Sequence, residues 1–431
     1  MNARFDVLVV GAGPAGIAAA VRASENGRRV GLVDDNPAPG GQIWRKGAPQ
    51  PEAARSWLTR LDASGAQRLQ GWRVFDAPQP GLLLAERSGF GADECAELRF
   101  GKLILATGAR ERFLPFPGWT LPNVMGVGGL DALVRGGLPI AGKRVLVAGT
   151  GPLLLAVAAE LTERGAHVVG LCEQASLPQL IPLGLQLLKQ PGKLLQGARL
   201  RFSSRNVPMF TGCWPVEAKG RDKLESVVVQ RGTRHWEIAC DYLACGFHLV
   251  PNLELPMLLG CRIDQGFVTA DDLQQTSIAN VYCAGEPTGI GGVERAIFEG
   301  QIAGLAATGR TEEARRLGRT RPAMQSFARA LDRACALNPE LRNLPHDGTF
   351  VCRCEDVPLA ALREHRSWRE AKLLSRCGMG PCQGRICGAA TTFLFGWTPD
   401  SIRPPLLPAR MSSLSACGAA GDSLQQPKET R

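Results

Sequence analysis

The apolar and polar positions of the first 34 residues follow the order strand, turn, helix, strand. The apolar run Phe5–Val10 has the length and β-type composition of a buried strand, and it stops at a glycine. After Pro14, the alanine-rich segment 17–23 is typical of a helix, and a second apolar run, 29–33, is typical of a strand. The pattern predicts a parallel βαβ unit with a glycine-rich turn after its first strand.

The glycines of this turn have the spacing of a dinucleotide-binding motif. Gly11 permits the tight turn, Gly13 lets the backbone approach a pyrophosphate, and Gly16 lets the helix and the strand pack closely. Asp34 closes the second strand 18 residues after Gly16, where a carboxylate hydrogen-bonds a ribose hydroxyl. We therefore predict nucleotide binding, with a plain glycine-rich turn as the alternative.

The same pattern recurs between residues 143 and 173. An apolar strand leads into Gly149 and Gly151, and a second strand ends at Glu173, which favours a free ribose 2′-hydroxyl over a 2′-phosphate. Leu154 stands where the third glycine belongs, so we expect a wider contact between helix and strand. This internal repeat is either a site for NAD(H) or another adenine nucleotide such as ATP, or a vestigial fold.

Composition and charge narrow the class of protein. A chain of 431 residues exceeds one hydrophobic core, so two or three domains are expected. No uninterrupted apolar window reaches about 18 residues, so no transmembrane segment is expected.

The net charge of +10 comes mostly from scattered arginines, and no basic run is mixed with aromatic residues, so nucleic-acid binding is not expected. The apolar run 7–20 imitates a signal peptide but holds the glycine turn, so we expect a cytoplasmic protein with reduced cysteines.

Five of the fourteen cysteines fall in a window of 36 residues: Cys352, Cys354, Cys377, Cys382 and Cys387. The first two point to the same side of an extended segment, and the other three lie in a glycine-rich turn. Such thiols can converge on one soft metal centre. The tight Cys-x-Cys pair is less typical of structural zinc than of an iron–sulfur cluster, although zinc remains the main alternative.

Other candidate chemistry is weak. Cys240 and Cys245 have Cys-x4-Cys spacing, but a strand places them on opposite faces, so a thiol–disulfide mechanism is not expected. None of the five histidines stands in a catalytic pattern, and no catalytic substrate base is recognised.

Three further segments resemble FAD-contacting elements of glutathione-reductase-like flavoproteins. Gly40-Gly41-Gln42 resembles their second contact loop, and the strand 103–110 resembles their Ala-Thr-Gly turn, with Thr107 and Gly108. The segment 276–286 resembles the strand that ends beside the flavin ribityl chain, with Gly285 and with Glu286 where many relatives have Asp. The resemblance implies FAD at the first βαβ unit, held by Gly11, Gly13, Gly16, Asp34, Gly41, Gln42, Thr107, Gly108, Gly285 and Glu286.

The cysteine segment resembles the 2Fe–2S domain of bacterioferritin-associated-ferredoxin type. It is most similar to the version fused to FAD-containing α-type subunits of hydrogen cyanide synthase, opine oxidase and (hydroxy)proline dehydrogenase complexes, and the likeness runs from residue 5 to about 410. The resemblance implies Cys352, Cys354, Cys382 and Cys387 as the cluster ligands and leaves Cys377 as a spare thiol.

The same resemblance implies the fold and its parts. We expect an α/β flavoprotein with two Rossmann-type dinucleotide-binding domains and a small helical Cys-rich 2Fe–2S domain. The expected parts are an FAD-binding domain (1–120 and 251–307), an inserted nucleotide-binding-like domain (121–250), a helical connector (308–346), the 2Fe–2S domain (347–398), and a Pro-rich strap with a disordered tail (399–431).

The implied function is electron transfer within an amine or imino-acid dehydrogenase for D-hydroxyproline, an opine, proline or glycine. Its implied partner is a D-amino-acid- or sarcosine-oxidase-like FAD β-subunit, and a small ferredoxin-like subunit is a further candidate. Attachment to the inner membrane through partners is compatible with the cytoplasmic expectation. The alternatives are a stand-alone NAD(P)H-dependent reductase that feeds its own cluster, and a non-enzymatic module for iron–sulfur delivery.

Overall fold

The computed structural model describes residues 1–431 except 45–50, 88, 90–93, 320, 400–401 and 419–431. The chain forms two compact units, and each is described by itself. The first contains Met1–Ala109, Pro251–Pro322 and Ser401–Arg431, and the second contains Arg110–Val250 and Ala323–Asp400. The five-part division expected from the sequence stays a prediction, and the tail from residue 419 lies outside the described residues.

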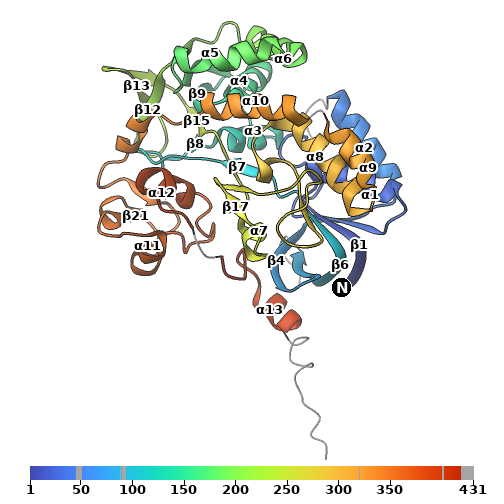
Figure 1. The fold of residues 1–431 in the computed structure, drawn as a ribbon. Helices are drawn as coiled ribbons and strands as arrows, with labels where there is room; N and C mark the ends of the chain where they lie inside the picture. The colour runs from blue at the N-terminus through green and yellow to red at the C-terminus, as the bar shows by residue number, and fades with distance from the viewer. Residues whose placement is uncertain (45–50, 88, 90–93, 320, 400–401, 419–431) are drawn as a thin grey trace, which may run out of the picture. The chain divides into compact units, whose positions relative to one another are not determined.

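The first unit is built on a seven-stranded sheet with the order β3-β2-β1-β6-β5-β4, in which β19 also pairs with β6 (Figure 1). Its strands are β1 (Asn2–Val10), β2 (Val30–Asp34), β3 (Gln67–Gln70), β4 (Trp72–Gln79), β5 (Leu82–Arg87), β6 (Cys95–Leu105) and β19 (Val281–Cys283). Leu105 pairs in parallel register with both Val10 and Cys283. The carboxyl ends of these three strands therefore meet at one edge, where open α/β sheets bind their ligands.

The helices of the first unit are α1 (Pro14–Glu25), α2 (Glu52–Ala63), α7 (Glu254–Leu258), α8 (Gly292–Ala307), α9 (Thr311–Gly318) and α13 (Met411–Gly418). A short hairpin joins β17 (Ile263–Asp264) and β18 (Phe267–Val268). Helices α1 and α8 approach closely because small residues face each other. A Cβ atom on Gly300 would lie 2.1 Å from the Ala15 carbonyl oxygen, and one on Gly304 would lie 2.5 Å from that of Ala19. Only glycine permits this spacing.

The Pro-rich segment after residue 401 returns to the sheet of the first unit. Leu406 is buried in the core of this unit, and its backbone N–H donates to the Phe75 carbonyl oxygen at 2.8 Å. The Arg410 N–H donates to the buried Glu86 carboxylate at 3.0 Å. The segment is thus fastened to β4 and β5, and it leads into α13, a helix that the sequence did not predict.

The second unit repeats the parallel design with the strand order β11-β10-β9-β15-β8. Its parallel strands are β8 (Val124–Met125), β9 (Arg144–Thr150), β10 (His167–Glu173), β11 (Met209–Thr211) and β15 (Tyr242–Phe247). An antiparallel sheet of β12 (Cys213–Lys219), β13 (Ser226–Arg231) and β14 (Arg234–Ala239), and a pair of β7 (Ala109–Glu111) and β16 (Leu249–Pro251), complete its strands up to residue 251. The helices up to that point are α3 (Val127–Arg135), α4 (Pro152–Glu163), α5 (Leu177–Leu188) and α6 (Pro191–Ser203).

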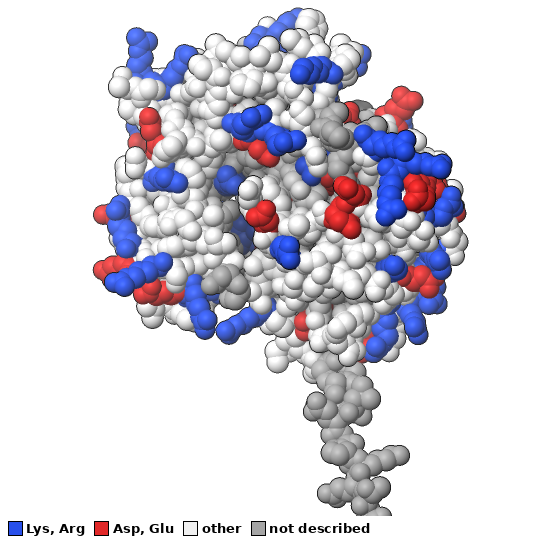
Figure 2. Space-filling model, in the orientation of Figure 1, with Lys and Arg blue, Asp and Glu red and all other residues white. Residues whose placement is uncertain are grey.

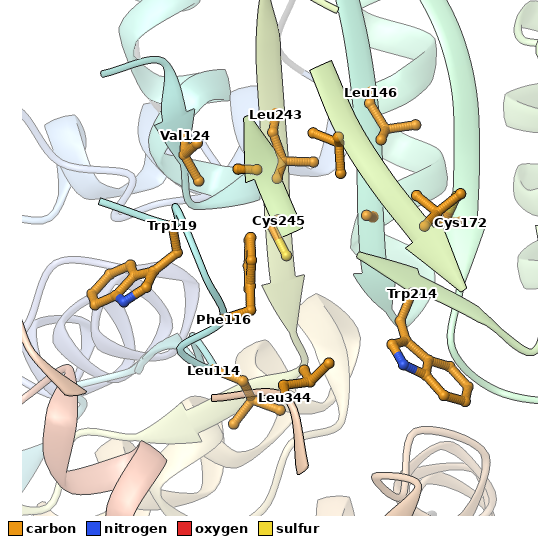
Figure 3. Close-up of a cluster of buried hydrophobic side chains, with 14 of the residues drawn as sticks. Leu114, Phe116, Trp119, Val124, Leu146, Cys172, Trp214, Leu243, Cys245 and Leu344 are labelled. Carbon is orange, nitrogen blue, oxygen red and sulfur yellow. The ribbon is translucent and has the colours of Figure 1, made fainter. Parts of the chain in front are cut away.

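The core of the second unit includes residues from the expected connector. Phe116, Trp119 and Trp214 pack with Leu146 and Leu243 of the parallel sheet, and Leu344 joins the same cluster (Figure 3). The segment that follows α10 (Arg321–Ala334) through η2 (Pro339–Asn343) is therefore part of this unit, because its leucines share the apolar core.

The cysteine segment adds β20 (Phe350–Cys352), β21 (Val357–Pro358), η3 (Ala360–Leu362), α11 (Trp368–Ser375) and α12 (Cys387–Phe395) to the second unit. It has a small core of its own around Leu362, Trp368 and Trp397. The Trp119 indole N–H donates to the Phe350 carbonyl oxygen at 2.7 Å and so fastens the segment to the rest of the unit. None of the helices in the described ranges combines the length and apolar character needed to span a membrane.

Candidate functional site

The turn after β1 can be built only with glycine at two positions. Gly11 has a φ of +104°, and a Cβ atom there would lie 2.2 Å from the Ala106 carbonyl oxygen. A Cβ atom on Gly16 would lie 1.7 Å from the Gly11 carbonyl oxygen. The strand, the turn and the first residues of α1 are thus packed backbone against backbone, which leaves the turn itself as a cradle without side chains.

Asp34 fixes the shape of this turn. Its half-buried carboxylate accepts the Ala12 N–H at 2.5 Å through one oxygen and the Asn36 N–H at 2.8 Å through the other. The acid predicted to meet a ribose hydroxyl therefore lies beside the turn. Its ribose contact stays a prediction.

The Gly40-Gly41-Gln42 loop lies directly against the turn. The Gly40 N–H donates to the Ala12 carbonyl oxygen at 2.8 Å, and a Cβ atom on Gly41 would lie 2.8 Å from the Cα of Gly13. Gln42 is exposed beside them. Two segments expected to contact the same cofactor are therefore adjacent.

Thr107 and Gly108 are held by Asn252, a residue to which the sequence assigned no role at the site. The Thr107 hydroxyl donates to the Asn252 carbonyl oxygen at 2.8 Å, and the Asn252 amide returns a bond to the Thr107 carbonyl oxygen at 2.8 Å. The Asn252 N–H also donates to the carbonyl oxygen of Gly108, whose φ is +68°. These bonds fix the backbone at the sheet edge where β1, β6 and β19 end.

Gly285 is held by Glu299, a buried acid of α8 that the sequence analysis missed. The Glu299 carboxylate accepts the Gly285 N–H at 2.9 Å and the Thr288 hydroxyl at 2.7 Å. Its other oxygen accepts the Arg295 Nε–H at 2.7 Å. The glycine spacing 300–304 on the same helix was the available signal, because it predicts close contact with a neighbouring helix.

Glu286 follows Gly285 and is half-buried. Burial raises the pKa of its carboxyl to about 7, and the nearby Arg295 charge opposes this shift. No hydrogen bond to the carboxyl group is found within the described ranges. A partly buried acid with a perturbed pKa at the ligand edge of the sheet fits a functional site.

The turn after β9 has the same backbone plan, but different side chains surround it. A Cβ atom on Gly149 would lie 1.8 Å from the Gly246 carbonyl oxygen, which reproduces the crowding at Gly11. Leu154, however, is buried in the apolar core of this unit. Glu173 is buried too, and it accepts the Thr150 hydroxyl at 2.6 Å and the Gly151 N–H at 2.9 Å. Burial raises the pKa of Glu173, an effect that these hydrogen bonds oppose.

Side chains from elsewhere in the second unit cover this turn. The Cβ position of Gly151 lies 3.4 Å from Cys335 Sγ and 3.5 Å from His248 Nδ1. Gln174 donates to the Thr150 hydroxyl at 3.3 Å and to the Ala336 carbonyl oxygen at 3.1 Å. The Asn338 N–H donates back to the Gln174 side chain at 3.0 Å. The segment after α10 is thereby clamped over the glycine turn.

Three of the five clustered cysteines meet at one point. The sulfur atoms of Cys352, Cys377 and Cys387 all lie within 4.8 Å of one another, and all three residues are buried. Cys382 is partly buried and hydrogen-bonded to Cys387, whereas Cys354 is exposed and lies beside Cys382. The structure thus brings together two of the four predicted ligands with the predicted spare thiol.

The thiols share protons unequally. Hydrogen bonds from Cys377 and Cys387 lower the pKa of Cys352 to about 2, whereas its bond to Cys352 raises the pKa of Cys377 to about 12. A hydrogen bond from Cys387 lowers the pKa of Cys382 to about 5, and the same group of thiols raises that of Cys387. Metal ligands are thiolates, so this group offers the right donor chemistry for a soft metal.

Glycines around the thiols let the turn fold tightly over Trp368. Cβ atoms on Gly378 and Gly384 would lie 2.7 Å and 2.8 Å from the Trp368 ring. The Gly378 N–H points at Cys352 Sγ at 3.5 Å, and hydrogen bonds of this kind tune iron–sulfur clusters. The glycines therefore determine the path of the turn and, with it, the positions of the cysteine sulfur atoms.

Several cysteines outside the cluster lie in apolar surroundings. Cys172, Cys240, Cys245, Cys261 and Cys283 are buried and unbridged, as expected for core residues. Cys95 is the exception to the expected reduced state because it is disulfide-bonded.

The two glycine turns, the FAD-type cradle and the paired parallel sheets define a flavoprotein with two dinucleotide-binding-type units. Residues 5–300 match the family described as pyridine nucleotide-disulphide oxidoreductase, and the chain belongs to this family. The predicted two-unit α/β fold and the assignment as an FAD-dependent oxidoreductase are therefore confirmed. The placement of FAD at the turn of the first unit stays a prediction.

Relatives and solved structures agree with this assignment. The chain is 34% identical to one of the opine oxidase subunits of Rhizobium meliloti (strain 1021), over 95% of this chain and 98% of the relative. It is 31% identical to hydrogen cyanide synthase subunit HcnB of Pseudomonas protegens, over 88% and 89% of the two chains. The predicted resemblance to FAD subunits of such complexes is confirmed.

Two solved structures share the fold. L-proline dehydrogenase from P. horikoshii superposes with a TM-score of 0.67 at 18% identity, over 96% of this chain and 80% of that chain. T. acidophilum thioredoxin reductase gives a TM-score of 0.56 at 20% identity, over 72% and 99%.

Proposed function

We propose that this chain is the FAD- and 2Fe–2S-containing electron-transfer subunit of a multisubunit amine or imino-acid dehydrogenase. The observation that carries the proposal is the meeting of three buried thiols, with two more beside them, in a chain of a flavoprotein family. Flavins accept two electrons and release them singly, which suits a one-electron cluster. The proposed substrates are D-hydroxyproline, an opine, proline or glycine.

The proposed cluster ligands are Cys352, Cys354, Cys382 and Cys387. All donors in the group are sulfur, without histidine or carboxylate, which suits an iron–sulfur cluster and also zinc. Cys377 is the competing ligand because its sulfur is close to those of Cys352 and Cys387. Gly378 would hold the Cys352 sulfur through its N–H.

The amine itself is proposed to be oxidised on a partner. The relatives are named as subunits, and the alpha subunit of the sarcosine oxidase from Corynebacterium sp. (strain U-96) is 30% identical over 39% of this chain. The proposed partner is a D-amino-acid- or sarcosine-oxidase-like FAD β-subunit, with a small ferredoxin-like protein as a further one. The complex is proposed to work in the cytoplasm, with attachment to the inner membrane through these partners.

The reductase alternative requires nicotinamide at the turn after β9, and the geometry there argues against it. The Gly151 N–H is already donated to Glu173, and Cys335 and His248 lie over the turn. We propose that this unit binds neither NAD(H) nor ATP and serves as the scaffold on which the cysteine segment is built.

Metal analysis of the full chain tests the cluster. Anaerobically purified protein is expected to contain about two irons per chain. Cys352→Ser should abolish the EPR signal of the reduced cluster and leave FAD bound. Cys261→Ser, a buried cysteine far along the chain from the cluster, is the matched control and should keep the signal. Zinc without iron would contradict the proposal.

The competing ligand can be separated by two further variants. If the proposed set is correct, Cys377→Ser keeps the cluster signal and Cys382→Ser loses it. The reverse result assigns Cys377 as a ligand.

Capture of the tagged chain from its native cells tests the assembly. The captured complex should reduce a dye with one of the proposed amines, whereas the isolated chain should not. Amine oxidation by the isolated chain alone would contradict the proposal that the amine is oxidised on a partner subunit.

A further inference from the structure

The helix α5 is apolar around most of its surface, and it exposes one row of leucine and isoleucine side chains. The side chains of Leu177, Ile181, Leu185 and Leu188 are spaced at four, four and three residues, so they lie on one face of the helix. They are 63%, 54%, 60% and 65% exposed, and no residue of the helix is fully buried. Ordinary surface helices have the opposite arrangement.

Hydrogen bonds hold the helix in this orientation. Gln179 donates to the carbonyl oxygens of Ala334 at 3.2 Å and Ala336 at 2.9 Å, next to the end of α10. Gln186 donates to the Ser326 hydroxyl at 3.0 Å, on α10 itself. The less exposed side of α5 holds these two glutamines together with Leu180, Leu183 and Leu187, and it faces the rest of the unit. The row of four exposed apolar side chains faces outward.

The following helix α6 continues the apolar surface. It packs against α4 and α5 (Figure 1), and Leu194, Leu195 and Phe202 are 42%, 54% and 67% exposed. The Arg205 guanidinium lies 4.7 Å from the centre of the Phe202 ring. Apolar and basic side chains thus alternate over one helical hairpin, and together they form what we call the α5–α6 surface: the exposed side chains of residues 177–205.

The charge of this surface is of one sign. Between Gln174 and Val216 the sequence has no Asp or Glu, although the chain contains 40 acidic residues. The same stretch carries five basic residues: Lys189, Lys193, Arg199, Arg201 and Arg205. Figure 2 shows the top of the view, where α5 and α6 lie, as white and blue without red.

We infer that the α5–α6 surface binds an anionic phospholipid bilayer. An in-plane helix with a leucine row inserts its apolar side chains at the headgroup level, and lysine and arginine bind anionic headgroups. Protein interfaces favour Trp, Tyr, Phe and Arg and disfavour Lys, and residues 177–205 contain one Phe, three Arg and two Lys but neither Trp nor Tyr. The choice of a bilayer therefore rests on the exposed apolar row beside five basic residues without an acidic one. The inference concerns direct lipid contact and does not depend on the proposed redox function.

Flotation of the purified full chain with vesicles tests the inference. Vesicles of phosphatidylcholine with one-third phosphatidylglycerol should carry the protein upward, and pure phosphatidylcholine vesicles should retain much less of it. Raising the salt concentration should weaken binding, because charge attraction to the headgroups is screened. Lys189→Glu combined with Arg199→Glu should lower the affinity at least about tenfold.

Paired glutamine variants separate insertion from charge. Ile181→Gln with Leu185→Gln should abolish flotation, whereas melting temperature and FAD content stay at the wild-type values because these side chains are already exposed. The matched control is Leu373→Gln with Leu374→Gln on α11, where the leucines are 62% and 70% exposed. This control should float like the wild type.

Three results would overturn the inference. The wild-type chain would fail to float with anionic vesicles, or it would float equally with neutral ones. Alternatively, Ile181→Gln with Leu185→Gln would leave flotation unchanged and instead alter oligomeric state or the retention of a partner protein, which would assign the surface to a protein.

Discussion

The turn after β1 and the turn after β9 have the same backbone plan and differ in the side chains that surround them. At the first, the nearest group to the Cβ position of Gly13 among the described residues is the Cα of Gly41 at 3.9 Å. At the second, the corresponding position of Gly151 is covered by the side chains of Cys335 and His248. We therefore expect a nucleotide at the first turn and none at the second.

The acids at the two strand ends show the same contrast. Both acids accept backbone N–H groups and one side-chain donor, the Asn36 amide at Asp34 and the Thr150 hydroxyl at Glu173, but Asp34 is half-buried and Glu173 is buried. Burial raises the pKa of Glu173, so that acid is part of an internal hydrogen-bond network. A motif with correct spacing can therefore be structural.

The largest expected effect comes from making the first turn like the second. Gly16→Leu would place a Cβ atom 1.7 Å from the Gly11 carbonyl oxygen, a backbone overlap that no rotamer relieves. We expect loss of FAD and destabilisation by more than about 4 kcal/mol, measured as flavin absorbance per chain and by denaturant unfolding. Gly318→Ala, with nothing within 4 Å and no positive φ, is the control and should keep FAD. A flavin-replete Gly16→Leu protein would contradict this account of the turn.

The buried acids give the next largest effect. Glu299→Ala leaves the partly buried Arg295 without its carboxylate partner and should destabilise the chain by about 3 kcal/mol. FAD affinity should fall as well, because Gly285 and Thr288 lose their acceptor. The matched variant Glu173→Ala should also destabilise the chain, since the Gly151 N–H loses its acceptor, but FAD should remain bound. Equal loss of FAD in both variants would remove the distinction between the two turns.

Local patterns predicted the strands, the glycines, the FAD segments and the clustered cysteines, because each of these motifs consists of residues that are close together in the sequence. Contacts across long separations were not predictable. Gln174 and Asn338 are 164 residues apart, and no pattern in either segment indicates that they are hydrogen-bonded. Residues 308–346 were expected to be a helical connector, and their packing partner was not predictable: Leu344 packs in the same core as Leu146. The proximity of Cys377 to Cys352 likewise depends on how the glycine turn folds over Trp368.

A smaller effect should appear in the pH dependence of stability. Burial raises the pKa of Glu286 from 4.5 to about 7, so the folded chain holds this proton more tightly than the unfolded chain. Its contribution to stability is complete below pH 4.5 and is lost as the pH rises through 7. The upper bound is about 3 kcal/mol, reduced by solvent at the half-buried carboxylate. Melting of the FAD-free chain should depend less steeply on pH in Glu286→Gln. Identical slopes would show that Glu286 is not buried as described.

No effect of NADH or ATP on stability is expected, and this tests directly whether the turn after β9 binds a nucleotide. FAD at a hundred times its Kd should stabilise the FAD-free chain by about 2.7 kcal/mol, because ligand binding shifts the folding equilibrium. NADH and ATP should give no shift in melting temperature, since Gln174 clamps residues 336–338 over the turn and Gly151 donates its N–H to Glu173. NADH should likewise leave the flavin absorbance unchanged. Saturable stabilisation by either nucleotide that Gly151→Val abolishes would show that the clamp opens, and would make the second turn a binding site like the first.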